Sequence, residues 1–487
     1  MTDAAAVAAS LFVPALGAAT IAACHRRPNV REAATLGTAL SLFATVALLL
    51  PAVLAGGRPG FSVGEILPGL AIAFRVEPLG MLFALIASAL WIVNSLYSIG
   101  YMRANREANQ TRFYVCFALA LVATMGVAYA ANMLTLFLFY EMLTLVTYPL
   151  VTHSGTAEAR QGGRVYLGLL LGTSILFLLP ALVVTWAVAG TTDFRPGGIL
   201  GGKMSAAAFG SLLALYMFGI GKAALMPFHR WLPAAMVAPT PVSALLHAVA
   251  VVKAGVFSAV KVIVFVFGVD QLRAAHSTDW LVAIAGFTII AASLVALKTD
   301  NLKRLLAYST VSQLSYIVLA AAVLAPLSLI GAVLHIAAHA LGKITLFFAA
   351  GAIYTGSGKT EVSELDGIGR RMPWTMGAFA VGTLSMIGLP PAFGFISKWY
   401  MLSGAMASSH WLAVAVIVGS TLLNAAYFLP IVYRAFFVAP PNDASSVHGE
   451  APLPMVIALT ATAAGTVLLF LMPDVPLALA RQMLAGG

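Results

Sequence analysis

Long apolar segments dominate this chain and leave it few folds to adopt. About fourteen of them can be marked along the 487 residues, and only 9% of all residues are charged, against roughly 25% in soluble domains. A segment of about 20 apolar residues can cross the hydrocarbon core of a bilayer as a helix. The pattern therefore predicts an all-α polytopic membrane protein with about 14 transmembrane helices.

The expected spans are separated by short polar loops, and no long polar segment follows any of them. A single membrane domain over residues 1–487 is therefore predicted. The first span is interpreted as a membrane helix and not as a cleavable signal, because its charged residues follow the apolar stretch. The spans lie near residues 3–24, 33–56, 76–100, 113–130, 132–152, 165–189, 205–233, 241–267, 279–298, 303–324, 327–354, 374–404, 410–436 and 452–472.

Lysine and arginine are distributed unevenly between alternate loops. The loops that follow odd-numbered spans hold 16 of them, and the opposite loops and tails hold 6. Because positive residues favour the cytoplasmic side, both termini are expected to lie outside a bacterial inner membrane. The same bias accounts for the formal net charge of +10 without nucleic acid as a partner.

Two features that suggest a cofactor can be set aside. Cys24 and Cys116 are far apart and have no partner motif, which excludes a cluster held by this chain's own cysteines. The stretch TGSGKT at 355–360 has Ile353 where a phosphate-binding loop needs glycine, and an apolar helix is expected before it in place of a strand. We therefore expect no cofactor.

Ionisable residues inside the expected spans are the strongest functional signal. Such groups are costly in hydrocarbon, and they mark an ion or proton path by default. Unlike arginine, a buried lysine can release its proton. The one acid well inside a span is Glu141, and the lysines are Lys222, Lys253, Lys261, Lys343 and Lys398. Lys261 lies near a helix end, where we expect its side chain to snorkel to the surface.

The stretch HIAAHALGKITLFF places His335, His339 and Lys343 on one helical face. We interpret the histidines as a proton relay, because a neutral imidazole accepts on one nitrogen and donates from the other. Two structural core histidines or a metal site are the alternatives, the latter without a nearby acid. Glu141 and Lys222 are interpreted as an electrostatic switch, with a structural ion pair as the alternative.

Two spans are rich in glycine and proline, at 217–233 and 386–401, and each carries a lysine near the expected break. Paired interrupted helices of this kind point to inverted repeats. We expect two five-helix repeats, spans 4–8 and 9–13. The corresponding divisions of the chain are 1–112, 113–267, 279–436 and 452–487.

Four longer motifs, KRLLAYSTVSQLSY, APTPVSALLHAVAVVKAGVF, HIAAHALGKITLFFAAGAI and GLPPAFGFISKWYM, occur within residues 75–436. In these the chain resembles the antiporter-like family, which comprises the proton-pumping membrane subunits of respiratory complex I and the large subunits of Mrp-type Na⁺/H⁺ antiporters. The resemblance implies fourteen core helices, ten of which form two inverted five-helix repeats. It also implies a proton path through Glu141, Lys222, Lys253, His247, His335, His339, Lys343 and Lys398.

We therefore expect a proton-translocating subunit that works with other membrane subunits and has no redox site of its own. Since the chain leaves no room for a long lateral helix, the first hypothesis is the D subunit of an Mrp-type Na⁺/H⁺ or K⁺/H⁺ antiporter. The second is a pumping subunit of a complex I-like NADH:quinone oxidoreductase or of a membrane-bound hydrogenase. The third is an energy-coupling subunit for another transport process, or a structural scaffold.

Overall fold

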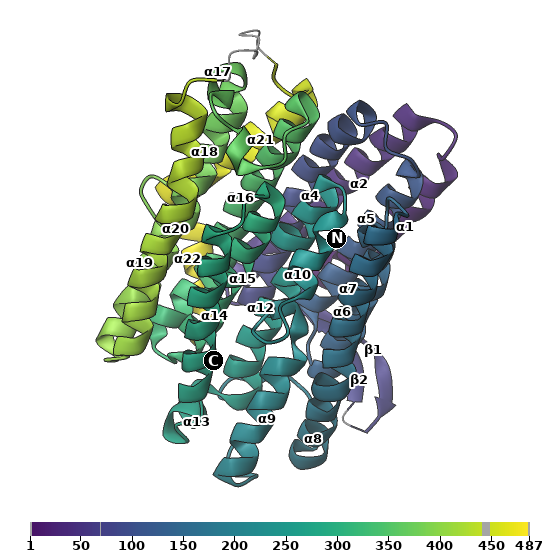
Figure 1. Ribbon diagram of the computed structural model, residues 1–487. Helices are drawn as coiled ribbons and strands as arrows, with labels where there is room; N and C mark the ends of the chain where they lie inside the picture. The colour runs from purple at the N-terminus through teal and green to yellow at the C-terminus, as the bar shows by residue number, and fades with distance from the viewer. Residues whose placement is uncertain (1, 69, 441–448, 486–487) are drawn as a thin grey trace.

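A computed structural model describes residues 2–68, 70–440 and 449–485 and shows long helices packed side by side (Figure 1). Among these residues, twelve helical segments are long and apolar enough to cross a membrane, so the chain is a multi-pass membrane protein. Every one of the fourteen expected spans contains helix. The exact count of fourteen transmembrane helices is not confirmed, because two of the expected spans are interrupted.

The first half of the chain begins with α1 and ends with an interrupted helical segment over residues 240–267. Its helices are α1 (Asp3–Ala23), α2 (Pro28–Ala47), α3 (Leu50–Leu54), α4 (Pro78–Ala104), α5 (Gln110–Tyr129), α6 (Met133–Val151), α7 (Ala157–Thr173), η1 (Ser174–Leu178), α8 (Leu179–Ala189), α9 (Ala206–Gly219), η2 (Gly221–Ala223), α10 (Trp231–Ala234), η3 (Ala235–Val237), α11 (Thr240–Ala244), η4 (Leu245–Val249), α12 (Val251–Lys261) and η5 (Val262–Phe267).

The second half is built around one long central helix, α16. Its helices are α13 (Val269–Ala274), α14 (Asp279–Leu297), α15 (Leu302–Ala322), α16 (Pro326–Ser357), η6 (Val362–Glu364), α17 (Ile368–Arg371), α18 (Pro373–Ile387), α19 (Phe393–Ala407), α20 (Trp411–Phe437), α21 (Leu453–Leu471) and α22 (Asp474–Ala485). α16 packs against α15, α18, α19 and α21, and also against α4 and α11 of the first half. It therefore joins the two halves.

Helix ends follow local sequence. Side chains of Asn132 and Asn301 accept backbone N–H groups at the starts of α6 and α15, as short polar residues do at N-caps. Proline begins α4, α16 and α18, where its missing N–H costs nothing. Gly358 and Gly388 end α16 and α18 in the left-handed conformation that glycine adopts readily.

The two breaks expected from the sequence are present. The seventh expected span is divided into α9, which ends at Gly219, and the short turns η2 and α10. The twelfth is divided into α18 and α19, which leave residues 388–392 outside helix. These interruptions shorten α9, α18 and α19 below the length of a full membrane span. The division into two inverted repeats stays a prediction.

A β-hairpin occupies a segment that the sequence analysis treats as a loop. β1 (Gly60–Leu67) pairs antiparallel with β2 (Leu70–Arg75), from Gly60 opposite Arg75 to Leu67 opposite Leu70. The start of α6 closes over it, since Asn132 Nδ2 donates to Ala71 O at 2.8 Å. The fold is thus helical with one small sheet at one end of the bundle.

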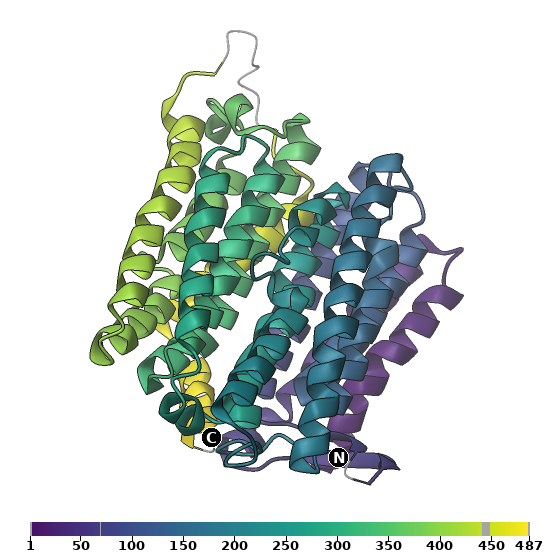
Figure 2. The ribbon, with the colours of Figure 1, turned by 60° about the horizontal axis from the view of Figure 1, so that its bottom comes forward.

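Contacts between loops define two opposite faces of the molecule. One face, called here the cationic face, joins the loops near residues 24–31, 101–112, 152–156, 298–303 and 358–371, for example through Arg103 with Glu32, and Arg112 with His153 O. The other, called the hairpin face, joins the hairpin to the loops near 131 and 194, for example through Arg75 with Phe194 O. Both ends of the described chain lie on the hairpin side (Figure 2).

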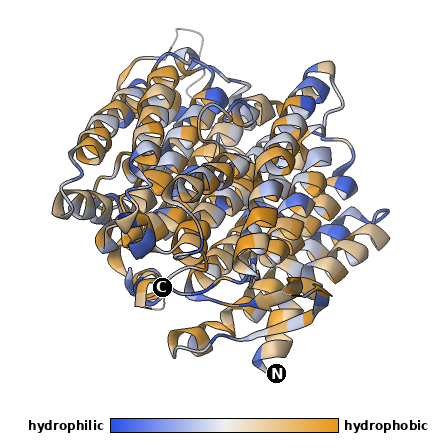
Figure 3. Ribbon diagram, turned by 90° about the horizontal axis from the view of Figure 1, so that it is seen from below, coloured by the Kyte–Doolittle hydropathy of each residue, from blue (hydrophilic) through white to orange (hydrophobic). Residues whose placement is uncertain are grey.

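The polarity of the bundle is partly reversed compared with a soluble protein. Large apolar side chains point outward along several helices, with Phe12, Leu176 and Leu422 all more than half exposed. Seen from the hairpin side, hydrophobic residues prevail along the helices and hydrophilic ones gather in several loops (Figure 3). Many buried positions are polar or cationic. Because the exterior is apolar and ionisable residues are buried, the candidate functional groups lie inside the bundle.

Candidate functional site

The eight positions that the sequence singles out come from α6, η2, η4, α12, α16 and α19. Of these, α12 and α16 lie in the middle of the bundle, and α19 lies near one edge (Figure 1). All but one are buried, and the exception, Glu141, is half-buried. The buried ones are Lys222, His247, Lys253, His335, His339, Lys343 and Lys398.

Lys222 lies in the break between α9 and α10. Its Nζ donates to Tyr140 O at 2.7 Å and to Thr144 Oγ1 at 2.6 Å, and it stands 3.2 Å from the centre of the Tyr140 ring. The carbonyl of Gly221 in this break accepts from Ala224 N and also from Trp231 Nε1, each at 3.0 Å. The turn is therefore fastened against α6, and protein groups satisfy the ammonium.

Glu141 follows Tyr140 on α6, yet it does not bond Lys222. Both carboxylate oxygens are buried and have no hydrogen-bond partner among the described residues. The direct ion pair that the switch hypothesis expects is thus not formed in this arrangement. Because Lys222 instead binds the carbonyl of the preceding residue, the two charges remain neighbours that interact through space.

Lys253 and His339 meet between α12 and α16. Lys253 Nζ contacts His339 Nδ1, while His339 Nε2 has no hydrogen-bond partner in the described part of the chain. His247 lies on η4, the segment that precedes α12 and Lys253. The centre of its ring is 4.9 Å from that of Phe347. Both of its ring nitrogens are also without a partner there. Three titratable groups thus gather beside α16.

His335 is held from both sides. Its Nε2 is 3.0 Å from Gln313 Oε1 on α15, and its Nδ1 is 2.9 Å from Ser397 Oγ on α19. The rings of His335 and His339 are 6.2 Å apart, one helical turn along α16. The amide of Gln313 donates in turn to Met386 O at 3.3 Å. His335 is therefore the point at which α15, α16, α18 and α19 are linked by polar contacts.

Lys398 closes this series at the second break. Its Nζ donates to Met386 O at 2.7 Å and to Ile387 O at 3.1 Å, the last carbonyls of α18. A cation at a helix C-terminus is favoured by the helix dipole and by the carbonyls left without helical partners. The broken helix thus provides the binding site for the ammonium. The ring of Tyr316 lies 4.6 Å from it.

Lys343 is connected to a different set of groups. Its Nζ donates to Ser309 Oγ at 2.7 Å and to Leu306 O at 3.3 Å, both on α15. Tyr427 of α20 also donates to Ser309 Oγ, at 3.0 Å. The structure therefore brings the α16 lysine to the hydroxyl-rich face of α15, and not into direct contact with His339 one turn earlier.

Together these contacts form a buried polar series. Lys253, His339 and His335 follow one another along α12 and α16, and Gln313 and Met386 O connect His335 to Lys398. The backbone of Lys222 packs against Gly255 on α12, two residues after Lys253. The expected site residues are thus brought together in the core, with Lys222 and Glu141 as a separate group.

The expectation that Lys261 snorkels to the surface is wrong. Its side chain is fully buried and does not reach the surface, because Nζ lies 3.1 Å from Glu77 Oε2 and donates to Ala130 O at 2.8 Å. Glu77 precedes α4 directly, and its carboxylate also binds Arg75 at 2.9 Å. The acid that pairs with Lys261 stands at the very start of an expected span, so a search for acids well inside spans could not find it.

Several partners of the site were not singled out from the sequence, notably Tyr140, Thr144 and Ser397. Thr144 and Tyr140 lie on either side of Glu141 on the same helix, which is the signal that could have found them. No group of three His, Cys, Asp or Glu side chains that could hold a metal ion occurs within the described ranges. The stretch TGSGKT contains the end of a helix, α16, and the turn that follows it.

Comparison with known proteins agrees with this architecture. Residues 130–424, more than half of the chain, match the family described as NADH:quinone oxidoreductase/Mrp antiporter, TM. Subunit N of the NADH-quinone oxidoreductase of Desulforudis audaxviator is 32% identical over 428 residues, which is 86% of this chain and 83% of the relative. A probable K⁺/H⁺ antiporter protein of Rhizobium meliloti, its A/B subunit, is 32% identical over 85% of this chain, but only 42% of that relative is covered.

A solved structure has the same fold. A chain of the Mrp complex from Dietzia sp. DQ12-45-1b superposes with a TM-score of 0.86 at 21% identity, covering all of this chain and 97% of the other. The protein described here is thus a polytopic helical membrane subunit with a buried lysine–histidine series. It belongs to the NADH:quinone oxidoreductase/Mrp antiporter membrane-subunit family.

Proposed function

We propose that this protein translocates protons as one subunit of a multi-subunit membrane complex. The observation that carries the proposal is the buried series from Lys253 through His339 and His335 to Lys398. Lysine and histidine both exchange protons, and buried lysines without carboxylate partners serve stability poorly. A structural scaffold has no need of four such groups in succession.

The contacts suggest how a proton passes. Lys253 gives its proton to His339 Nδ1, which it already contacts. His335 receives it one turn away along α16. From His335 the proton passes to the hydroxyl of Ser397, which lies against His335 Nδ1 and precedes Lys398 in α19. Lys343, Lys222 and Glu141 act as neighbouring charges that bias the direction of transfer.

An external energy source is required, because moving one charge against a membrane potential costs about 2.3 kcal/mol per 100 mV. A relative matched over most of both chains belongs to an NADH-quinone oxidoreductase, which favours a redox-driven complex. The second candidate is a cation/proton antiporter complex, supported by the antiporter relative of equal identity. The antiporter D subunit predicted from the sequence and the choice of Na⁺ or K⁺ stay predictions. Partner proteins that co-purify with the tagged chain distinguish the two candidates.

The proposal is tested with Lys253→Met in the complex reconstituted into vesicles. We expect proton uptake to fall by roughly tenfold or more, since the residue that starts the series can no longer carry a proton. Lys203→Met is the matched control, because Lys203 is exposed in the loop after α8. Both variants are compared at equal content of partner subunits. Normal proton uptake by an assembled Lys253→Met complex would refute the proposed function.

A further inference from the structure

A cavity of about 330 Å³ lies on the cationic face, where α4, α11, α15 and α16 meet. Tyr101, Thr240, Lys303 and Ala350 line it, together with Glu107 from the loop between α4 and α5. The Glu107 side chain keeps 24% of its surface exposed, so the cavity is in contact with the aqueous side. None of the contacts proposed above uses Glu107 or Lys303.

Two walls of this cavity lead inward to His247. Thr240, in the wall, begins the helical run that carries His247 seven residues later, about 10 Å deeper along the axis. Ala350, which also lines the cavity, is one turn of α16 from Phe347, whose ring packs on His247. The inner end of the cavity therefore points toward the titratable groups beside α16.

Polar atoms without partners mark the same route. Asn94 Oδ1, Ser243 Oγ and both ring nitrogens of His247 are buried and lack hydrogen-bond partners among the described residues. Asn94 reaches this route directly, since its Nδ2 donates to Pro241 O at 3.4 Å. Buried polar atoms are normally satisfied, and ordered water is the usual partner where protein groups are missing. These atoms are therefore available as hydrogen-bond partners for water between the cavity and His247.

The surroundings of Glu107 suit a group that gains and loses a proton. Burial raises the pKa of its carboxyl group, and the positive charge of Lys303 opposes this only in part. His153 Nε2 lies 4.0 Å from the carboxylate, but burial and the nearby Arg112 lower the pKa of His153. His153 is therefore neutral at physiological pH and does not hold Glu107 in its ionised form.

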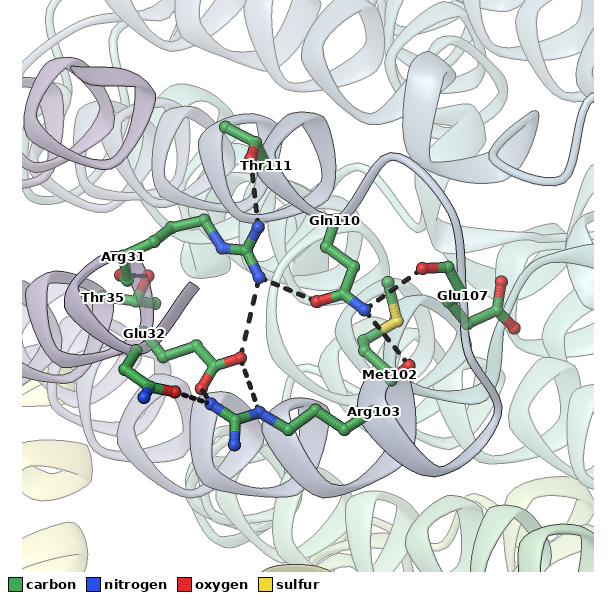
Figure 4. Close-up of polar contacts among 9 residues, drawn as sticks. Arg31, Glu32, Thr35, Met102, Arg103, Glu107, Gln110 and Thr111 are labelled. Carbon is green, nitrogen blue, oxygen red and sulfur yellow. Dashed lines mark hydrogen bonds and ion pairs between the residues drawn. The ribbon is translucent and has the colours of Figure 1, made fainter. Parts of the chain in front are cut away.

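The backbone of Glu107, by contrast, is fixed. Gln110 Nε2 donates to Glu107 O at 3.1 Å, while Gln110 Oε1 accepts from Arg31 at 2.7 Å. Arg31 belongs to a buried cluster with Glu32, which Arg103 also binds (Figure 4). In that view the Glu107 carboxylate points away from the cluster. The contacts of Gln110 and Arg31 thus fix the backbone of Glu107, while its carboxylate makes no bond to this cluster.

We propose that Glu107 collects protons at the mouth of this cavity and passes them along the path past Ser243 to His247. This inference rests on the proposed function and adds the residue that supplies protons to the buried series. Glu107 binds one proton from water and releases it into the cavity, so no other reactant is needed. Lys303 also lines the cavity, and its positive charge favours release of the proton from Glu107.

The test is the pH dependence of proton uptake in vesicles that contain the assembled complex. Glu107→Gln is expected to lower uptake severalfold at pH 8.5, where free protons are scarce, and to have little effect at pH 6. Glu107→Asp should restore most of the loss, because a shorter carboxylate still binds a proton. Glu158→Gln serves as control, since Glu158 is an exposed carboxylate on the same face.

Each outcome decides something definite. A loss that deepens with pH and is restored by aspartate supports proton collection by Glu107. A loss of equal size at every pH indicates a structural role and overturns the proposal. Unchanged uptake by Glu107→Gln also overturns it, while the proposed function stands if Lys253→Met has abolished uptake. If uptake survives in Lys253→Met, the proposed function fails independently.

Discussion

At the scale of single residues, His335 shows how a proton can change a buried hydrogen-bond pattern without moving a helix. Gln313 donates to Met386 O, so its oxygen faces His335 and requires a proton on Nε2. In a neutral His335, Nδ1 then accepts a hydrogen bond from the Ser397 hydroxyl. When His335 is doubly protonated, Nδ1 donates to Ser397, whose hydroxyl turns to Gly394 O at 3.0 Å. The direction of the Ser397 hydroxyl thus depends on the protonation state of His335.

Replacing Gln313 with leucine tests this arrangement. The variant leaves His335 Nε2 without its acceptor, and a hydrogen bond worth about 1.5 kcal/mol corresponds to roughly a tenfold change in rate. We expect proton uptake by the reconstituted complex to fall by about that factor. Gln271→Leu is the control, because Gln271 makes a comparable bond to Gly197 O on the hairpin face. Equal uptake in the two variants would show that the bond from Gln313 to His335 does not matter for transfer.

The sequence supports residue-level prediction where charge and hydrophobicity conflict. Lys253, His339 and Lys398 stand out because they are ionisable within apolar spans, and the structure buries all three. The partners Ser397 and Tyr140 do not stand out, because hydroxyl groups are common in membrane helices and usually bond their own backbone. Only the packing of one helix against another shows which hydroxyl faces a lysine.

At the scale of elements, the second break brings the start of α19 so close to α18 that only glycine fits between them. A Cβ added to Gly394 at the start of α19 would come within 1.8 Å of Ser385 O on α18. Lys398 lies one turn further along α19 and binds the last carbonyls of α18. The spacing of the two half-helices and the position of the ammonium are therefore set together.

We expect Gly394→Ala to destabilise the protein by roughly 1–3 kcal/mol, as overpacking of a dense interior does. The transition temperature of the purified complex in detergent should fall accordingly. Gly377→Ala on α18 is the matched control, because no atom lies within 4 Å of the added Cβ. It should be neutral or more stable by up to about 1 kcal/mol, since alanine is the better helix former. Similar transition temperatures for both variants would contradict the steric argument.

The elements differ in how far their sequences predict them. Both breaks are predictable, because glycine and proline interrupt otherwise apolar helices. The hairpin β1–β2 was missed, although its two strands flank Pro68 and Gly69, a common turn pair. The hairpin lies in the polar connection between two expected membrane helices, where strands are not expected. The amphipathic α22 was missed in the same way, as it packs along α4 and α16 instead of spanning.

At the scale of the whole molecule, the loops alternate between two faces as the span pattern predicts. The loops rich in Lys and Arg contact one another on the cationic face, for example through Lys303 with Ala238 O and Asn301 with Glu361. The ends of the described chain lie on the opposite face (Figure 2). Only the loop charges predict which face meets the cytoplasm.

Orientation is therefore the prediction that belongs to the whole molecule. Because positive loops are retained in the cytoplasm, the cationic face should point inward and the hairpin face outward. Ser62→Cys places a thiol on the exposed strand β1, and Lys298→Cys places one at the exposed end of α14. Both are made in a chain in which Cys24 and Cys116 are replaced by serine.

In intact cells, a maleimide that cannot cross the membrane should label Ser62→Cys and leave Lys298→Cys unlabelled. Breaking the cells open should allow both to react, which controls for accessibility. The reverse pattern would place Glu107 and its cavity on the outer side, and protons would then enter the buried series from outside. Since one face carries the cavity, this labelling fixes the direction in which the proposed path runs.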